Sequence, residues 1–179
     1  MKFALSPCPD DFLETAPGRY ELELHVAATP ERAFAIISGE GEEEWFPGFR
    51  SLTWNDAPGV GASRVLRLST LTLQERFLVW EPGRAMRFEV DWMSLPLCRR
   101  FLEDYTLEPE HRGTRILWRI AYEATPALTP LRALLHPILG RDFKRASAGI
   151  ERYAAKALKV RPPPSEAPPV PLRLRKPAD

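Results

Sequence analysis

Between residues 50 and 124 the chain consists of stretches of alternating apolar and polar residues, separated by short turns rather than by helical patterns. In the last stretch, residues 114–124, Trp118 and Tyr122 fall on one face and Arg119 falls on the other. A period of two predicts half-buried strands. Strands joined by short turns pair antiparallel, because parallel strands need long crossover connections. The middle of the chain therefore predicts one antiparallel sheet.

Helical patterns flank this strand-rich region. A first alternating strand, residues 20–26, precedes Thr29-Pro30-Glu31, which is typical of a helix start with a threonine cap and proline in the first turn. A second short helix is expected over residues 40–45. After the sheet, apolar residues recur at helical spacing from residue 131 to residue 157, and Pro137 and Gly140 are expected to kink or break that helix. This order predicts an α+β fold with seven strands, two short helices after strand one and a long C-terminal helix.

Proline content sets the expected boundaries. Seven of the 19 prolines fall in residues 161–179, which predicts a proline-rich disordered tail. Residues 1–18 carry three more prolines and are expected to be an irregular lead-in. The folded domain is then residues 19–160. Within the tail, Pro168–Arg173 fits a P-x-x-P-x-R ligand of a polyproline-binding domain.

Composition and charge exclude several classes of protein. The net charge of +1 gives no electrostatic case for nucleic-acid binding. No apolar run reaches the roughly 18 residues of a membrane-spanning helix, and the first residues are too weakly apolar for a secretory signal. The two cysteines, Cys8 and Cys98, fit reduced thiols, so we expect a cytoplasmic protein.

Several motifs taken in order resemble a known family. The segment Val26–Phe34 after the first strand, and then Trp45-Phe46-Pro47, are similar to the opening of the polyketide cyclase/dehydrase and lipid-transport proteins. Glu75–Arg84 resembles that family's strand-turn-strand signature, and Gly113–Trp118 its last strand before the long helix. These proteins belong to the START-like (SRPBCC) superfamily, whose birch-pollen-allergen-like members share a helix-grip fold.

The resemblance covers residues 19–158 and implies a curved antiparallel sheet wrapped around the C-terminal helix, with a hydrophobic cavity between them. Family members include lipid and polyphenol carriers, quinone binders and aromatase/cyclases, so the fold alone does not select a function. Apolar and aromatic side chains are expected to line the cavity, because ligand pockets are built mainly from such groups. The expected apolar ligand-binding residues are Phe77, Phe88, Trp92, Phe101, Tyr105, Trp118, Tyr122, Leu135 and Leu139.

Three charged residues fall on the faces of these strands that are expected to point inward. Glu75 shares its strand face with Phe77, and Glu103 shares its strand face with Tyr105. Arg64 shares its strand face with the leucines that follow it. A one-residue slip would expose every apolar neighbour, so we expect Arg64, Glu75 and Glu103 to meet as a polar spot in the cavity wall. A carboxyl held among apolar walls has a raised pKa and suits acid–base chemistry, so Glu75 and Glu103 are the candidate catalytic residues. The alternative interpretation is a structural ion pair, or side chains carried to solvent by bulges.

Other chemistries lack support in the sequence. His25, His111 and His136 are expected to face solvent, and no cluster has metal-ligand spacing. Phosphate-binding loops, dinucleotide fingerprints and nucleophile elbows are absent, so no cofactor is expected. The acidic run Glu40–Glu44 is interpreted as a solvated surface.

The sequence therefore favours a non-catalytic carrier that binds a small hydrophobic molecule, such as a lipid, a polyketide, a quinone or another aromatic compound. The first alternative is an enzyme of the aromatase/cyclase kind that uses a cavity carboxylate. The second alternative is an interaction module that acts through its proline-rich tail.

Overall fold

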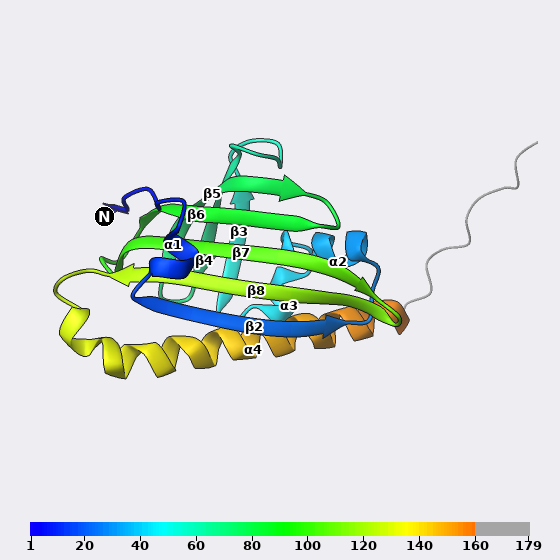
Figure 1. Cartoon of the computed structure of the whole chain (residues 1–179). Coiled ribbons are helices and arrows are strands. Elements are labelled where there is room, and N and C mark those ends of the chain that lie inside the picture. The colour runs from blue at the N-terminus through cyan, green and yellow to red at the C-terminus, as the bar shows by residue number, and fades with distance from the viewer. Residues whose placement is uncertain (160–179) are drawn as a thin grey trace, which may run out of the picture.

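The computed structural model describes residues 1–159, except for the side chains of residues 131–135, 158 and 159. The proline-rich tail and its Pro168–Arg173 motif lie outside the described residues. The disorder of the tail and the polyproline-binding partner of the motif therefore stay predictions. Within the described range the chain has one sheet and one long helix, which runs along the sheet in Figure 1.

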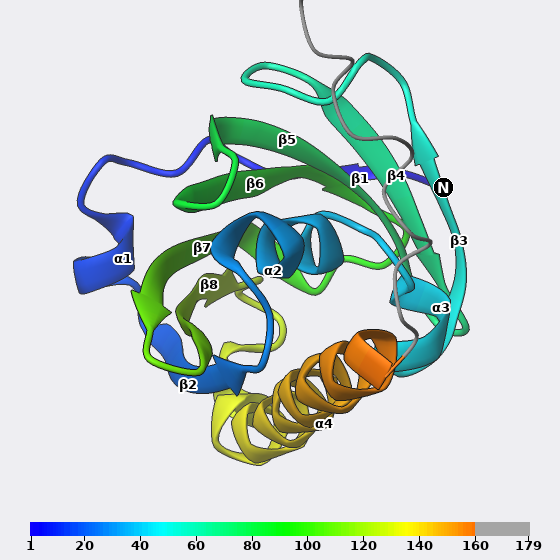
Figure 2. The same ribbon diagram turned by 90° about the vertical axis from the view of Figure 1, so that its right-hand side faces the viewer.

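The sheet is antiparallel and curved, as predicted. Its strands follow the order β2-β8-β7-β6-β5-β4-β3, and a short additional strand, β1, pairs with β6. Figure 2 shows the sheet curling from β2 round to β3, with the C-terminal helix on the open side of the curl. The strands are β1 (Phe3–Ala4), β2 (Gly18–Val26), β3 (Phe49–Trp54), β4 (Ser63–Leu68), β5 (Thr72–Glu81), β6 (Ala85–Met93), β7 (Cys98–Glu110) and β8 (Gly113–Ala124).

Two helices, α2 (Pro30–Ile37) and α3 (Glu42–Trp45), follow β2. The predicted start of α2 is confirmed: the Thr29 hydroxyl accepts a hydrogen bond from the Arg32 amide, and Pro30 opens the first turn. This arrangement satisfies one of the amide groups that a helix start leaves without a partner.

The C-terminal helix, α4 (Arg132–Lys159), continues through Pro137 after a 3-10 turn at Thr129–Leu131, so it is not broken where the sequence predicted a kink or a break. Pro137 is the sixth residue of α4, so the helix continues past it without the hydrogen bond that an amide there would donate to the carbonyl of residue 133. Gly140 has a different role from the predicted break. A Cβ atom there would lie 2.9 Å from the Tyr20 ring, so glycine lets α4 approach β2 closely.

The lead-in contains two short elements that its proline content did not suggest. β1 pairs with the end of β6, and α1 (Phe12–Thr15) buries Phe12 on the outer face of the sheet. Phe12 and Ala16 pack there against Leu102 and Ala121. Parts of residues 1–18 therefore cover the convex face, while most of this lead-in lies outside regular elements.

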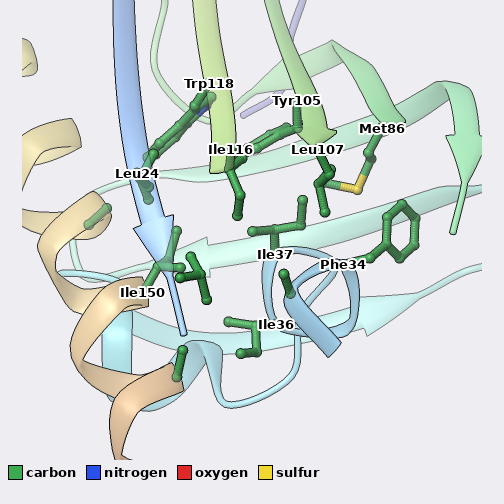
Figure 3. Close-up of a cluster of buried hydrophobic side chains, with 14 of the residues drawn as sticks. Leu24, Phe34, Ile36, Ile37, Met86, Tyr105, Leu107, Ile116, Trp118 and Ile150 are labelled. Carbon is green, nitrogen blue, oxygen red and sulfur yellow. The ribbon is translucent and has the colours of Figure 1, made fainter. Parts of the chain in front are cut away.

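The concave face carries the main core. Rings and aliphatic side chains from β2, β7, β8, α2 and α4 form a continuous buried cluster, in which Trp118, Ile116, Ile36 and Ile150 are inaccessible or nearly so. Figure 3 shows this cluster between α2 and α4. No helix among the described residues is long and apolar enough to cross a membrane.

Candidate functional site

Part of the concave face is left unfilled by the core and encloses a cavity of about 470 Å³. Exposed lining residues such as Pro47, Leu95 and Asp142 mark where the cavity reaches the surface. Most of the wall is apolar and comes from β4–β7, the loops at their ends and α4. These apolar residues include Leu66, Leu68, Leu71, Leu73, Phe88, Val90, Met93, Leu97, Phe101, Leu139 and Phe143.

A buried ion pair stands in this wall. Arg64 of β4 and Glu75 of β5 are directly opposite each other in the antiparallel register, and both are about 3% exposed. The Arg64 Nε–H donates to Glu75 Oε2, and Nη1 donates to the Ser38 carbonyl at 2.8 Å. Burial alone lowers the pKa of Arg64, but Glu75 and Glu42 outweigh that effect and raise it. The guanidinium therefore stays charged inside the protein.

Glu103 of β7 lies in the same cavity wall. It stands opposite Phe88 of β6, and its Oε2 accepts hydrogen bonds from the Tyr105 hydroxyl at 2.8 Å and from Trp118 Nε1 at 2.9 Å. Burial raises the pKa of Glu103 to about 8, although both hydrogen bonds oppose the shift. Near neutral pH the carboxyl is mostly protonated, so it holds a transferable proton beside the cavity.

A fourth buried charged residue of the cavity wall, Glu42, was missed by sequence reasoning. It belongs to the acidic run interpreted as a solvated surface, yet it is 2% exposed, whereas Glu43 and Glu44 are exposed. Burial raises the pKa of Glu42 to about 7, with Arg64 opposing the shift. Glu42 and Trp45 lie three residues apart on α3, so both point inward from one face of the helix.

The turn before α3 explains how Glu42 reaches the interior. Gly39 and Gly41 both have positive φ, at 129° and 65°, which glycine adopts without strain. A Cβ atom on Gly39 would lie 3.3 Å from Arg64 Nη1 and 2.8 Å from Leu52. The glycine thus leaves room for the guanidinium beside the turn. Because α3 has only four residues, its sequence is too short to show the repeating apolar pattern from which a buried helix face is predicted.

The structure brings together seven of the predicted ligand-binding residues. Of the predicted polar spot, Arg64 and Glu75 pair directly, whereas Glu103 lines the same cavity and is bonded to Tyr105 and Trp118. The role of all three toward a ligand stays a prediction. Phe77, Trp118 and Tyr122 do not line the cavity and belong to the packed interior instead. The side chain of Leu135 lies outside the described residues. The seven that line the cavity are Arg64, Glu75, Phe88, Phe101, Glu103, Tyr105 and Leu139.

Trp92 was wrongly placed on the cavity face. The register between β5 and β6 shifts by one residue, because Gln74 pairs with Trp92 whereas Glu75 pairs with Val90. This bulge reverses the alternation after Val90. Trp92 therefore lies on the outer face, where its Nε1–H donates to Gln74 Oε1 and the Lys2 ammonium stands 4.1 Å from its ring centre.

The histidines stay out of the cavity wall. His25 is exposed, as predicted, and its Nδ1 lies 3.0 Å from Glu110 Oε2. His136 differs from the prediction because it is half-buried: its ring stacks on Tyr20 with 4.3 Å between centres, and its Nδ1 lies 2.9 Å from the Tyr122 hydroxyl. Among the described residues, no group of three histidine, cysteine or acidic side chains could hold a metal ion.

Comparison with known proteins agrees with this architecture. Residues 17–155 match the family model of polyketide cyclase/dehydrase and lipid transport proteins. The chain belongs to this family. Among curated family relatives, uncharacterised proteins of Mycobacterium tuberculosis and Mycobacterium bovis are 26% identical over 146 residues, covering 79% of this chain and 87% of theirs.

Solved structures share the family fold at low identity. The Zhui aromatase/cyclase from Streptomyces sp. R1128 is 12% identical with a TM-score of 0.68, and the match covers 79% of this chain and 96% of that one. The protein TTHA0849 from Thermus thermophilus is 20% identical with a TM-score of 0.65, covering 78% and 98%. The protein Ara h 8.0201 is 13% identical with a TM-score of 0.63, covering 77% and 97%. These likenesses establish the helix-grip fold.

The raised pKa of Glu103 predicts a specific pH dependence of stability. A carboxyl whose folded pKa lies above its unfolded pKa stabilises the fold fully below the unfolded value, and that contribution is lost as the pH rises. For Glu103 the window runs from about 4.5 to about 8. We expect the free energy of unfolding of the wild type, measured with urea, to fall between pH 5 and pH 8 relative to that of Glu103→Gln.

The control is Glu108→Gln on the same strand, because Glu108 is exposed. This variant should keep the pH dependence of the wild type. Parallel curves for the wild type and Glu103→Gln would show that the Glu103 carboxyl is not held in its neutral form.

Proposed function

We propose that this protein binds a small, largely hydrophobic molecule in the cavity between the sheet and α4, with the polar end of the ligand against Arg64, Glu75, Glu103 and Glu42. The observation that carries the proposal is an apolar cavity with a compact polar cluster in one wall. Its volume of about 470 Å³ falls in the usual range of roughly 300–1,000 Å³ for small-molecule sites. Apolar walls hold the body of such a ligand, and a few polar groups fix its orientation.

The chemistry of the lining favours a carrier. The lining residues that the structure describes include no histidine, and Cys98 is an inert thiol because burial raises its pKa to about 12. Glu75 and Arg64 are engaged with each other in a buried ion pair. Binding and release of a ligand needs no more than these groups supply.

One observation favours catalysis as the second candidate function. The Glu103 carboxyl is buried in the cavity wall, its pKa is raised to about 8, and the Tyr105 hydroxyl is bonded to it. A carboxyl whose pKa lies near the working pH is suited to general acid–base catalysis. A cyclase or dehydrase would use it to move a proton to or from a ligand carbonyl or hydroxyl in the cavity.

Ligand binding is tested with N-phenyl-1-naphthylamine, an uncharged hydrophobic probe whose fluorescence rises in apolar surroundings. We expect one probe molecule per chain to bind with increased fluorescence. Val90→Phe should weaken binding at least tenfold, because Val90 is a buried residue of the cavity wall and the larger ring would occupy the cavity. Leu78→Phe is the matched control, since Leu78 is on the neighbouring strand, is exposed and does not line the cavity. Equal probe binding by Val90→Phe and the wild type would place the probe elsewhere and contradict the proposal.

Catalysis is tested with aromatic polyketide-like substrates and Glu103→Gln. If the protein is an enzyme, this variant should lose turnover and still bind the naphthylamine probe, because glutamine keeps the shape of the side chain and removes its titratable proton. The carrier function instead predicts no turnover by the wild type. Turnover that survives in Glu103→Gln would exclude Glu103 as the catalytic acid or base.

A further inference from the structure

The free oxygen of Glu42 is the starting point for naming the class of ligand. Among the buried side-chain atoms that the structure describes, Glu42 Oε2 is the one without a hydrogen-bond partner. Its nearest cationic atom, Arg64 Nη1, lies 4.0 Å away, which is beyond hydrogen-bond distance. A buried oxygen without a partner is unfavourable, and nearly all such atoms in proteins are satisfied. Glu42 is one of the residues that line the cavity, so a ligand can bring a hydrogen-bond donor to this carboxyl.

The charges around the cavity select against a negative ligand. Glu42, Glu75 and Asp142 line the cavity beside Glu103, whose carboxyl is mostly protonated near neutral pH, whereas Arg64 is the one basic side chain among the lining residues that the structure describes. Arg64 is already engaged by Glu75 and by the Ser38 carbonyl. A carboxylate ligand would thus enter a poorly solvated space beside surplus acidic groups without a cation of its own, which is strongly unfavourable.

A neutral hydroxyl meets the requirements of the same site. When the Glu42 carboxyl is ionised, the ligand hydroxyl donates a hydrogen bond to it. When the Glu42 carboxyl is protonated, the ligand hydroxyl can instead accept a hydrogen bond from the carboxyl O–H. In both states the buried oxygen gains a partner and no net charge is added. The apolar walls then hold the rest of the molecule, as in the proposed carrier function.

We propose that the cavity selects hydrophobic molecules that carry an alcohol or phenol hydroxyl, bound at Glu42, and rejects molecules in which a carboxylate replaces that hydroxyl. The inference rests on the proposed binding function and names its ligand class. Glu42 is then the residue that determines specificity, acting through its carboxyl.

The test is a matched series on one apolar body: 6-phenyl-2-naphthol, its methyl ether and 6-phenyl-2-naphthoate. Each competes with bound N-phenyl-1-naphthylamine at pH 7.5, where the naphthol is neutral and the naphthoate is ionised. We expect the naphthol to bind about tenfold or more tightly than the other two, because a site that hydrogen-bonds a hydroxyl leaves its own polar group unpaired without it. This comparison needs no variant, so it does not depend on how a substitution at Glu42 affects folding.

Glu42→Gln tests the residue itself. The amide removes the negative charge and adds an N–H donor, so binding of the naphthoate should strengthen and the preference for naphthol over naphthoate should fall at least tenfold. Glu43→Gln is the matched control on the same helix, because Glu43 is exposed, and it should keep the wild-type preference. A change of preference in Glu42→Gln alone would assign the selectivity to the buried carboxyl.

Three results overturn the inference. They are naphthoate binding to the wild type as tightly as naphthol, naphthol failing to displace the probe, and an unchanged preference in Glu42→Gln. None of these three results contradicts the proposed binding function if the naphthylamine probe still binds to the wild type and binds at least tenfold more weakly to Val90→Phe. Absence of probe binding to the wild type contradicts the binding function, and the inference falls with it.

Discussion

The Arg64–Glu75 ion pair connects three segments of the chain around the cavity. It crosses from β4 to β5, and through the Ser38 carbonyl it reaches the end of α2. The guanidinium also lies 5.2–5.9 Å from the ring centres of Trp54, Phe77 and Phe88. A buried charge is tolerated when it is paired and hydrogen-bonded, and each condition is met here. Gly39 leaves room for the guanidinium, and Glu42 Oε2 lies 4.0 Å from its Nη1.

Burial of the pair is weak evidence for a role in stability. The desolvation of two charges offsets most of their attraction, and well-packed apolar residues often replace such pairs without loss of stability. The apolar neighbours of the pair, Leu66, Leu73 and Val90, would form an uninterrupted wall without it. A cavity that only needed hydrophobic walls has no use for these charges. In the proposed function, the pair and the two carboxyls of raised pKa orient the polar end of the ligand.

The residue pattern predicted the antiparallel sheet and the three inward charges, whereas the helix-grip arrangement and its cavity were implied by the family resemblance. The strict alternation in β4, β5 and β7 fixes which side chains face inward, and the apolar neighbours of Arg64, Glu75 and Glu103 hold that register. The same reasoning failed at Trp92, because alternation carries no signal for the bulge opposite Gln74 and Glu75. It also failed at Glu42, whose burial depends on a glycine turn and on packing of α3 against the end of α4. These features depend on contacts between distant segments, which a local pattern does not contain.

The double variant Arg64→Met with Glu75→Leu tests most directly whether the polar cluster serves the ligand rather than the fold. We measure its free energy of unfolding at pH 7 and its affinities for 2-phenylnaphthalene and for a hydroxylated derivative of that hydrocarbon. If the cluster serves ligand recognition, stability stays within about 2 kcal/mol of the wild type or rises. The hydrocarbon then binds at least as well as before, and the preference for the hydroxylated compound is reduced. A loss of several kcal/mol with that preference unchanged would show that the pair holds the fold together and takes no part in recognition.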